Sequence, residues 1–182
     1  RVNPDIDSGS HPYIATGLKH NKFGVDVATA RRLFGQAARY PHVRFTGIQA
    51  HIGSQILEPS PLAQTAASLA SLASELLAGG LPLETLDLGG GVGVGETEES
   101  SLSPEAYAAA VLPELAGLGL RVLIEPGRSI VARAGALVAR VLYIKESASS
   151  GKHFVVTDAA MNDLLRPALY SAYHPIEPVV PR

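Results

Sequence analysis

Short apolar runs alternate along the chain with longer stretches in which apolar residues recur at helical spacing. The runs at residues 43–50, 83–88 and 121–124 have the length and aliphatic content of strands. Residues 61–78, and the stretch that begins at Ser103, have helical periodicity and separate these runs. This order predicts parallel strands joined by helical crossovers, which is an α/β fold.

The predicted helices carry start signals. Asp26 can cap a helix that runs to about Tyr40. Ser103 precedes Pro104 and caps the later helix, which we expect to end near residues 117–119.

Polar and glycine-rich motifs follow the three predicted strands. His51 comes after the first strand, Gly89 begins a run of three glycines after the second, and Glu125 follows the third. The intervals are 38 residues (51 to 89) and 36 residues (89 to 125), about one strand plus one helix. Parallel barrels build their active sites at the carboxyl ends of strands. The spacing therefore predicts an enzyme active site.

The pattern changes after about Arg133. Residues 136–146 and 153–157 are β-branched and aliphatic runs separated by a short polar turn. No stretch of crossover length lies between them, so the pattern predicts an antiparallel hairpin. We expect a partial barrel domain over residues 1–133 and the beginning of a C-terminal β domain over residues 134–182.

Composition and charge exclude several classes of function. The 15 Lys and Arg residues nearly balance the 17 Asp and Glu, which gives no sign of a nucleic-acid or membrane surface. No apolar run approaches transmembrane length. The absence of cysteine among the 182 residues excludes disulfides, thiolate metal sites and a cysteine nucleophile within them. We expect a cytoplasmic protein, and the start without Met leads us to expect a fragment of a longer chain.

The chemistry of the motifs leaves alternatives open. The glycine run can gather backbone amides around an anion, or it can be a flexible turn. Glu125 could hold a protonated nitrogen and Arg128 a phosphate or carboxylate, although the Pro-Gly sequence between them also makes an ordinary turn. His51 could be a base, a stacking group or a structural hydrogen-bonding residue. No second ligand stands at metal-binding spacing from it, so we expect no metal.

Two further sets of residues have a functional and a structural interpretation. Ser54 could contact a phosphate, or it could cap the following segment. Arg166 and Tyr170 are four residues apart and would lie on one side of a helical turn, where they suit a carboxylate. Arg166 could instead pair with Asp163.

Taken together, the motifs resemble those of the diaminopimelate decarboxylase family of pyridoxal-phosphate enzymes. They occur in that family's order and cover nearly the whole chain. The glycine run and the Glu-Pro-Gly-Arg motif are shared with ornithine- and arginine-type decarboxylases, whereas the first and last matching segments are more specific. The matching segments are His11–Gly17, Lys22–Gly24, His51–Gln55, Asp87–Gly91, Glu125–Arg128 and Met161–Tyr170.

The resemblance implies an architecture and an activity. The fold would be the second half of a TIM-like (β/α)8 barrel of the alanine-racemase type, followed by the start of an antiparallel β domain. The protein would be a homodimer with its active site at the subunit interface. With pyridoxal 5'-phosphate as cofactor, it would decarboxylate meso-2,6-diaminopimelate to L-lysine, in lysine biosynthesis. The family's Schiff-base lysine would precede Arg1 and its catalytic cysteine would follow Arg182, so we expect these residues alone to be inactive.

The resemblance also implies two catalytic residues. His51 would stack on the cofactor ring, with Ser54 lying near the cofactor, and Glu125 would bond the pyridine nitrogen. A carboxylate there keeps the nitrogen protonated, so that the ring can accept the electron pair left when CO₂ departs.

The remaining implied roles are in binding. Gly91, Gly127 and Arg128 would hold the cofactor phosphate, and Arg128, Arg166 and Tyr170 would bind substrate carboxylates. Two alternatives remain for the function. One is a related ornithine- or arginine-type decarboxylase, and the other is a non-catalytic homologue that regulates a decarboxylase.

Overall fold

The computed structural model describes residues 1–9, 16–18 and 22–180. The chain divides into two compact units, Arg1–Ala132 and Arg133–Arg182. Most of the motif at residues 11–17 lies outside the described residues.

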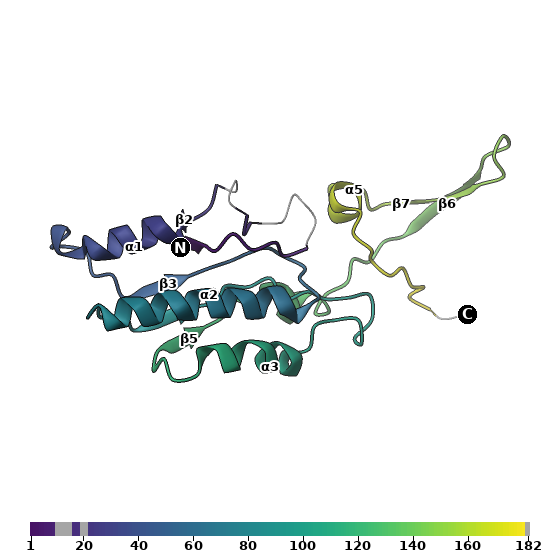
Figure 1. Cartoon of the computed structure of the whole chain (residues 1–182). Helices are drawn as coiled ribbons and strands as arrows, with labels where there is room; N and C mark the ends of the chain where they lie inside the picture. Colours follow the sequence, from purple (N-terminus) through teal and green to yellow (C-terminus); the bar gives the residue numbers. More distant parts are fainter. Residues whose placement is uncertain (10–15, 19–21, 181–182) are drawn as a thin grey trace. The chain divides into compact units, whose positions relative to one another are not determined.

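A three-stranded parallel sheet lies at the centre of the first unit (Figure 1). Gln49 pairs with Asp87, and Asp87 pairs with Leu123. These offsets of 38 and 36 positions equal the intervals between the sequence motifs. The predicted α/β fold with parallel strands is therefore confirmed. The strands lie in the order β3 (Gly47–Gln49), β4 (Thr85–Asp87) and β5 (Arg121–Leu123).

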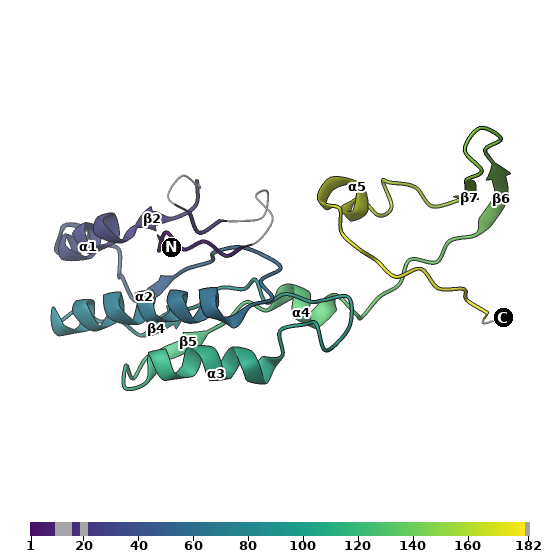
Figure 2. The ribbon, with the colours of Figure 1, turned by 45° about the vertical axis from the view of Figure 1, so that its right-hand side comes forward.

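Two crossover helices, α2 (Pro59–Ala78) and α3 (Pro104–Leu115), lie side by side against one face of this sheet (Figure 2). Ala73 of α2 and Leu86 at the centre of β4 are completely buried. Ser103 caps α3 as predicted, because its hydroxyl oxygen accepts a hydrogen bond from the Ala106 N–H at 3.1 Å. Apolar packing between the helices and the central strand is therefore the core of the unit.

The amino-terminal part of the first unit contains β1 (Val2–Asn3), which pairs in parallel with β2 (Val25–Asp26). Asp26 caps the next helix by accepting from the Thr29 N–H at 2.7 Å. The prediction that this helix runs to Tyr40 is wrong. The helix α1 (Val27–Gly35) ends because the Gln36 N–H is shared between two carbonyls, and the chain continues as a 3₁₀ turn (Ala37–Arg39).

The second unit contains the predicted antiparallel hairpin, formed by β6 (Val141–Glu146) and β7 (His153–Thr157). Its first strand begins five positions later than the predicted residue 136. The Asp158 carboxylate accepts from the Arg140 N–H at 2.7 Å, which replaces the next bond of the ladder. A short helix, α5 (Arg166–Tyr170), follows the hairpin.

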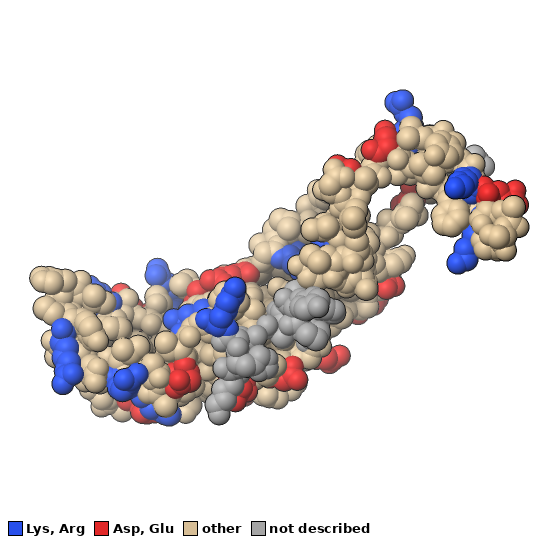
Figure 3. All heavy atoms as spheres, turned by 90° about the horizontal axis from the view of Figure 1, so that it is seen from above, with Lys and Arg blue, Asp and Glu red and all other residues tan. Residues whose placement is uncertain are grey.

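Basic and acidic side chains are interspersed over the face of the molecule seen in Figure 3. This distribution agrees with the nearly equal numbers of the two charge types. Within the described ranges, no helix has both the length and the apolar character needed to cross a bilayer.

Candidate functional site

The carboxyl ends of the three parallel strands bring the predicted motifs to one edge of the sheet. The register, continued by two positions, places His51, Gly89 and Glu125 beside one another. Main-chain hydrogen bonds continue past the strands, from the Ala50 N–H to the Asp87 oxygen (3.0 Å) and from the Glu125 N–H to the Gly89 oxygen (2.8 Å). The three motifs therefore form one connected group.

Two glycines of the run allow the three strand ends to approach closely. A Cβ atom at Gly90 would collide with the carbonyl oxygen of Glu125, and one at Gly91 would collide with that of Gly53. Gly91 also has a φ of +102°, which residues with side chains rarely adopt. The glycine run is thus required for packing, whatever it also binds.

His51 is half-buried, and its ring is oriented by the glycine run. The Gly90 N–H donates to Nδ1 at 3.1 Å, which makes Nδ1 an acceptor and leaves the ring proton on Nε2. Burial, and then the positive charge of Arg1, lower the pKa of His51, while Asp87 acts in the opposite direction. His51 is therefore a neutral imidazole with a defined tautomer.

Gln55 connects the His51 motif to the end of the glycine loop. Its Nε2 donates to the Val94 oxygen at 2.5 Å, and its Oε1 accepts from the Val94 N–H at 3.3 Å. The backbone of Gln55 is left-handed, with a φ of 62°. Ser54 is half-buried in the same segment. It does not cap α2, because the N-cap position is Glu58.

Glu125 leads from β5 into the short helix α4 (Gly127–Val131). Glu125 is exposed as a residue, yet partial burial of its carboxyl group and the negative charge of Asp87 raise its pKa. The Gly127 N–H donates to the Glu125 oxygen at 2.9 Å, and a Cβ at Gly127 would meet open space. Arg128 is half-buried in α4.

Arg166 and Tyr170 lie in the second unit, on α5, and share one side of that helical turn. The Arg166 guanidinium carbon is 5.8 Å from the centre of the Tyr170 ring. Asp163 instead accepts from the Ala160 N–H at 2.8 Å. Among the described residues, no ion pair joins Arg166 to Asp163, so the structural alternative for Arg166 is not observed.

Sequence reasoning assigned no role to three groups that the structure places around the motifs. Arg1 donates from Nη2 to the His51 oxygen at 3.0 Å. Asp87 accepts a hydrogen bond from the Gly89 N–H at 2.8 Å through Oδ1, and after burial its negative charge is the next cause of the raised pKa of Glu125. Burial, followed by the charge of Asp87, raises the pKa of Tyr107 to about 12. The sequence did contain a signal for Asp87. It is an acidic residue between two leucines of a predicted strand, so its side chain must lie on the opposite face from theirs.

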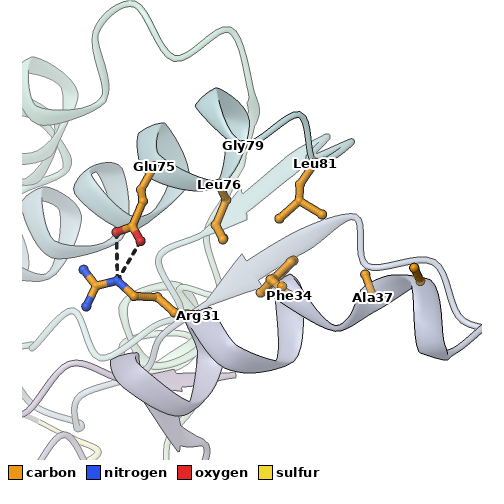
Figure 4. Close-up of a pocket in the computed structure, with 9 residues that line it drawn as sticks. Arg31, Phe34, Ala37, Glu75, Leu76, Gly79 and Leu81 are labelled. Atoms are coloured by element: carbon orange, nitrogen blue, oxygen red, sulfur yellow. Dashed lines mark hydrogen bonds and ion pairs between the residues drawn. The ribbon is translucent and has the colours of Figure 1, made fainter.

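A separate cavity of about 330 Å³ lies between α1 and the end of α2 (Figure 4). Arg31 borders it and forms an ion pair with Glu75 at 2.8 Å. Because α2 leads into β4, its carboxyl end lies at the amino end of that strand, opposite the motif edge. The cavity is therefore separate from the edge that carries the motifs.

Comparison with known proteins identifies the family. Residues 1–132 match the family model described as "Pyridoxal-dependent decarboxylase, pyridoxal binding domain". The chain belongs to the pyridoxal-dependent decarboxylases. The matched residues coincide with the first unit, and the match confirms the pyridoxal cofactor that the family resemblance implied.

The most similar relatives described here are diaminopimelate decarboxylases. The protein from Neisseria meningitidis serogroup A is 49% identical over 182 residues, which are 100% of this chain and 44% of the relative. The protein from Haemophilus influenzae is 48% identical over 174 residues, which are 95% of this chain and 41% of the relative. The chain therefore spans less than half the length of these relatives.

Solved structures give the same result. The diaminopimelate decarboxylase of Helicobacter pylori, complexed with L-lysine, aligns with a TM-score of 0.94 at 43% identity and covers 100% of this chain and 45% of that one. A lysine/ornithine decarboxylase of Vibrio vulnificus, complexed with putrescine, aligns with a TM-score of 0.73 at 28% identity over 85% of this chain and 42% of that one. The first likeness is the stronger in both sequence and fold.

We expect the His51 imidazole to titrate below its ordinary pKa of 6.5, because burial and Arg1 disfavour its charged form. Its contribution to stability is then present above pH 6.5 and is lost as the pH falls through the folded-state pKa. An NMR titration of ¹⁵N-labelled histidine, assigned with His51→Gln, measures both the midpoint and the Nε2 proton. A midpoint at or above 6.5 would contradict this prediction.

We expect Gln55→Ala to loosen the glycine loop, because it removes both bonds to Val94. The loss should be about 1–2 kcal/mol of unfolding free energy, together with faster hydrogen exchange at the Val94 amide. Gln64→Ala is the matched control, since Gln64 is exposed and, within the described residues, its side chain bonds to Ser60 of the same helix. Equal effects of the two variants would refute the connecting role of Gln55.

Proposed function

We propose that the protein containing this chain is a diaminopimelate decarboxylase. It would convert meso-2,6-diaminopimelate to L-lysine and CO₂ with pyridoxal 5'-phosphate, a reaction of lysine biosynthesis. The observation that carries the proposal is the placement of a neutral His51 ring and the Glu125 carboxyl group at one strand edge. The identity of 44–49% to diaminopimelate decarboxylases over the full chain supports the choice of substrate.

The residues at this edge fit the cofactor. Bound pyridoxal phosphate supplies an electron sink for the pair of electrons left when CO₂ departs. His51 would lie against the ring, since a neutral imidazole held by the Gly90 amide offers a flat face with no full charge. Glu125 would face the ring nitrogen and stabilise its protonated form. Ser54 would lie near the same group.

Phosphate and substrate would be held by the remaining predicted residues. Gly91, Gly127 and Arg128 are assigned to the phosphate, and the open space beside Gly127 leaves room for such a group. To bind the phosphate, the Gly127 N–H would have to give up its present hydrogen bond to the Glu125 carbonyl oxygen. Arg128, Arg166 and Tyr170 would bind the substrate carboxylates, for which guanidinium and phenol donors are suited.

The architecture proposed is the second half of a (β/α)8 barrel, followed by the start of an antiparallel β domain. The exposure of β5, an edge strand of the three-stranded sheet, supports this architecture. Val122, Leu123 and Ile124 are 39%, 39% and 50% exposed, and a further strand and helix would cover them. The cofactor-binding lysine would come from another part of the same protein. We also propose a homodimer with the active site at its interface.

We expect the full-length protein, loaded with pyridoxal phosphate, to release CO₂ and L-lysine from meso-diaminopimelate. Ornithine and arginine serve as competing substrates, and amino-acid chromatography measures the products. Turnover of ornithine or arginine, but not of diaminopimelate, would assign the protein to the related decarboxylases. Absence of turnover with all three, combined with binding to an active decarboxylase, would favour a regulatory homologue.

We expect Arg166→Ala to lower kcat/KM for diaminopimelate by about 10- to 100-fold, mainly through KM. A charge-assisted hydrogen bond to a carboxylate contributes roughly 1.5–3 kcal/mol, and each 1.4 kcal/mol is about tenfold. Arg140→Ala is the control in the same unit, since Arg140 is exposed and its described bonds to Asp158 use only its backbone. An unchanged KM in Arg166→Ala would remove this residue from the substrate site.

A further inference from the structure

Gln55 has a disfavoured backbone conformation and a side chain to which the proposed function gives no role. Its φ of 62° lies in the left-handed region, which glycine adopts easily and a residue with a side chain does not. The residue is half-buried and directly follows Gly53 and Ser54 in the motif after β3. A disfavoured conformation persists only where surrounding contacts enforce it, so the contacts of Gln55 indicate what the residue does.

The side chain of Gln55 pairs with the main chain of the loop at residues 91–95. Its Nε2 donates to the Val94 oxygen at 2.5 Å, and its Oε1 accepts from the Val94 N–H at 3.3 Å. Both polar atoms of the side-chain amide are therefore used on the same residue. Because a side-chain amide offers the same donor and acceptor as a peptide group, Gln55 pairs with the loop as a neighbouring strand would.

Main-chain hydrogen bonds continue this pairing to Gly91. The Ile56 N–H donates to the Gly91 oxygen at 2.9 Å, and the Gly93 N–H donates to the Ile56 oxygen at 2.8 Å. Gly91 also lies so close to Gly53 that a Cβ atom on it would collide with the Gly53 oxygen. In the part of the chain that the structure describes, the Gly91 N–H forms no hydrogen bond. The loop is thus fixed on both sides of an amide that is available to a ligand.

We propose that Gln55 is a positioning residue for the cofactor phosphate. Its two bonds to Val94 hold the loop against the motif after β3, so that the Gly91 N–H is oriented before the phosphate binds. A donor that is already oriented loses less conformational freedom on binding, which raises the affinity for the phosphate group. The inference rests on the proposed role of Gly91 at the phosphate, whereas the hold of Gln55 on the loop does not.

The test compares pyridoxal 5'-phosphate with pyridoxal, which has the same ring but no phosphate, as ligands of the full-length protein freed of cofactor. Gln55→Gly is the test variant, because glycine accepts the left-handed backbone and only the two side-chain bonds are lost. We expect the dissociation constant of pyridoxal 5'-phosphate, measured from the absorbance of the bound ligand, to rise about tenfold. The dissociation constant of pyridoxal should not change. Gln64→Ala is the control and should change neither value.

Hydrogen exchange in the unsubstituted full-length protein gives a second measurement that does not depend on the folding of a variant. Before cofactor is added, we expect the Val94 amide to exchange slowly and the Gly91 amide to exchange rapidly, because only the first is hydrogen-bonded. Addition of pyridoxal 5'-phosphate should slow exchange at Gly91.

Three results would overturn the proposal. The first is an unchanged affinity for pyridoxal 5'-phosphate in Gln55→Gly, or an equal loss for both ligands, since the effect would then not depend on the phosphate. The second is rapid exchange at Val94 in the cofactor-free protein, which removes the hold of Gln55 and leaves the proposed function intact. The third is exchange at Gly91 that bound cofactor does not slow, which also removes Gly91 from the proposed phosphate site.

Discussion

Close packing of backbone at the ends of three parallel strands is the constraint on which the rest of the structure depends. The strand after α2 can lie beside both neighbours only if the glycine run carries no side chains against Glu125 and Gly53. The same contacts give His51 its bond from Gly90 and anchor Glu125 to Gly89. The packing of the sheet and the geometry of the site are therefore one arrangement, and a side chain on the run would disturb both.

The sequence alone predicts the features that depend on local pattern. Ser103 and Asp26 cap their helices because a side-chain oxygen followed by a helical pattern needs no distant partner. The motif spacing of 38 and 36 residues predicts that the three motifs lie at the carboxyl ends of successive parallel strands, and the observed register agrees, because each crossover returns the chain to the same edge. The family resemblance, confirmed by the match of residues 1–132, supplied the cofactor.

Features that depend on distant contacts could not be predicted in this way. The early end of α1 follows from a shared N–H at Gln36, and the late start of β6 follows from the Asp158 carboxylate 18 residues away from Arg140. The effect of the Asp87 charge on Glu125 acts between neighbouring strand ends, and alternation predicts only the face on which Asp87 lies. Spacing reports which residues share an edge, but not which side chains meet there.

Burial is the largest cause of the pKa shifts of both predicted catalytic residues, and two charges of opposite sign act on them unequally. For His51 the positive charge of Arg1 outweighs the negative charge of Asp87, while for Glu125 the order is reversed. The stronger charge acts in the same direction as burial in both cases, so the pKa of His51 is lowered and that of Glu125 is raised. Both shifts favour the uncharged form of the side chain, the neutral imidazole of His51 and the protonated carboxyl group of Glu125. Asp87 lies on the strand between these two residues, and its negative charge raises the pKa of both, against burial at His51 and with burial at Glu125.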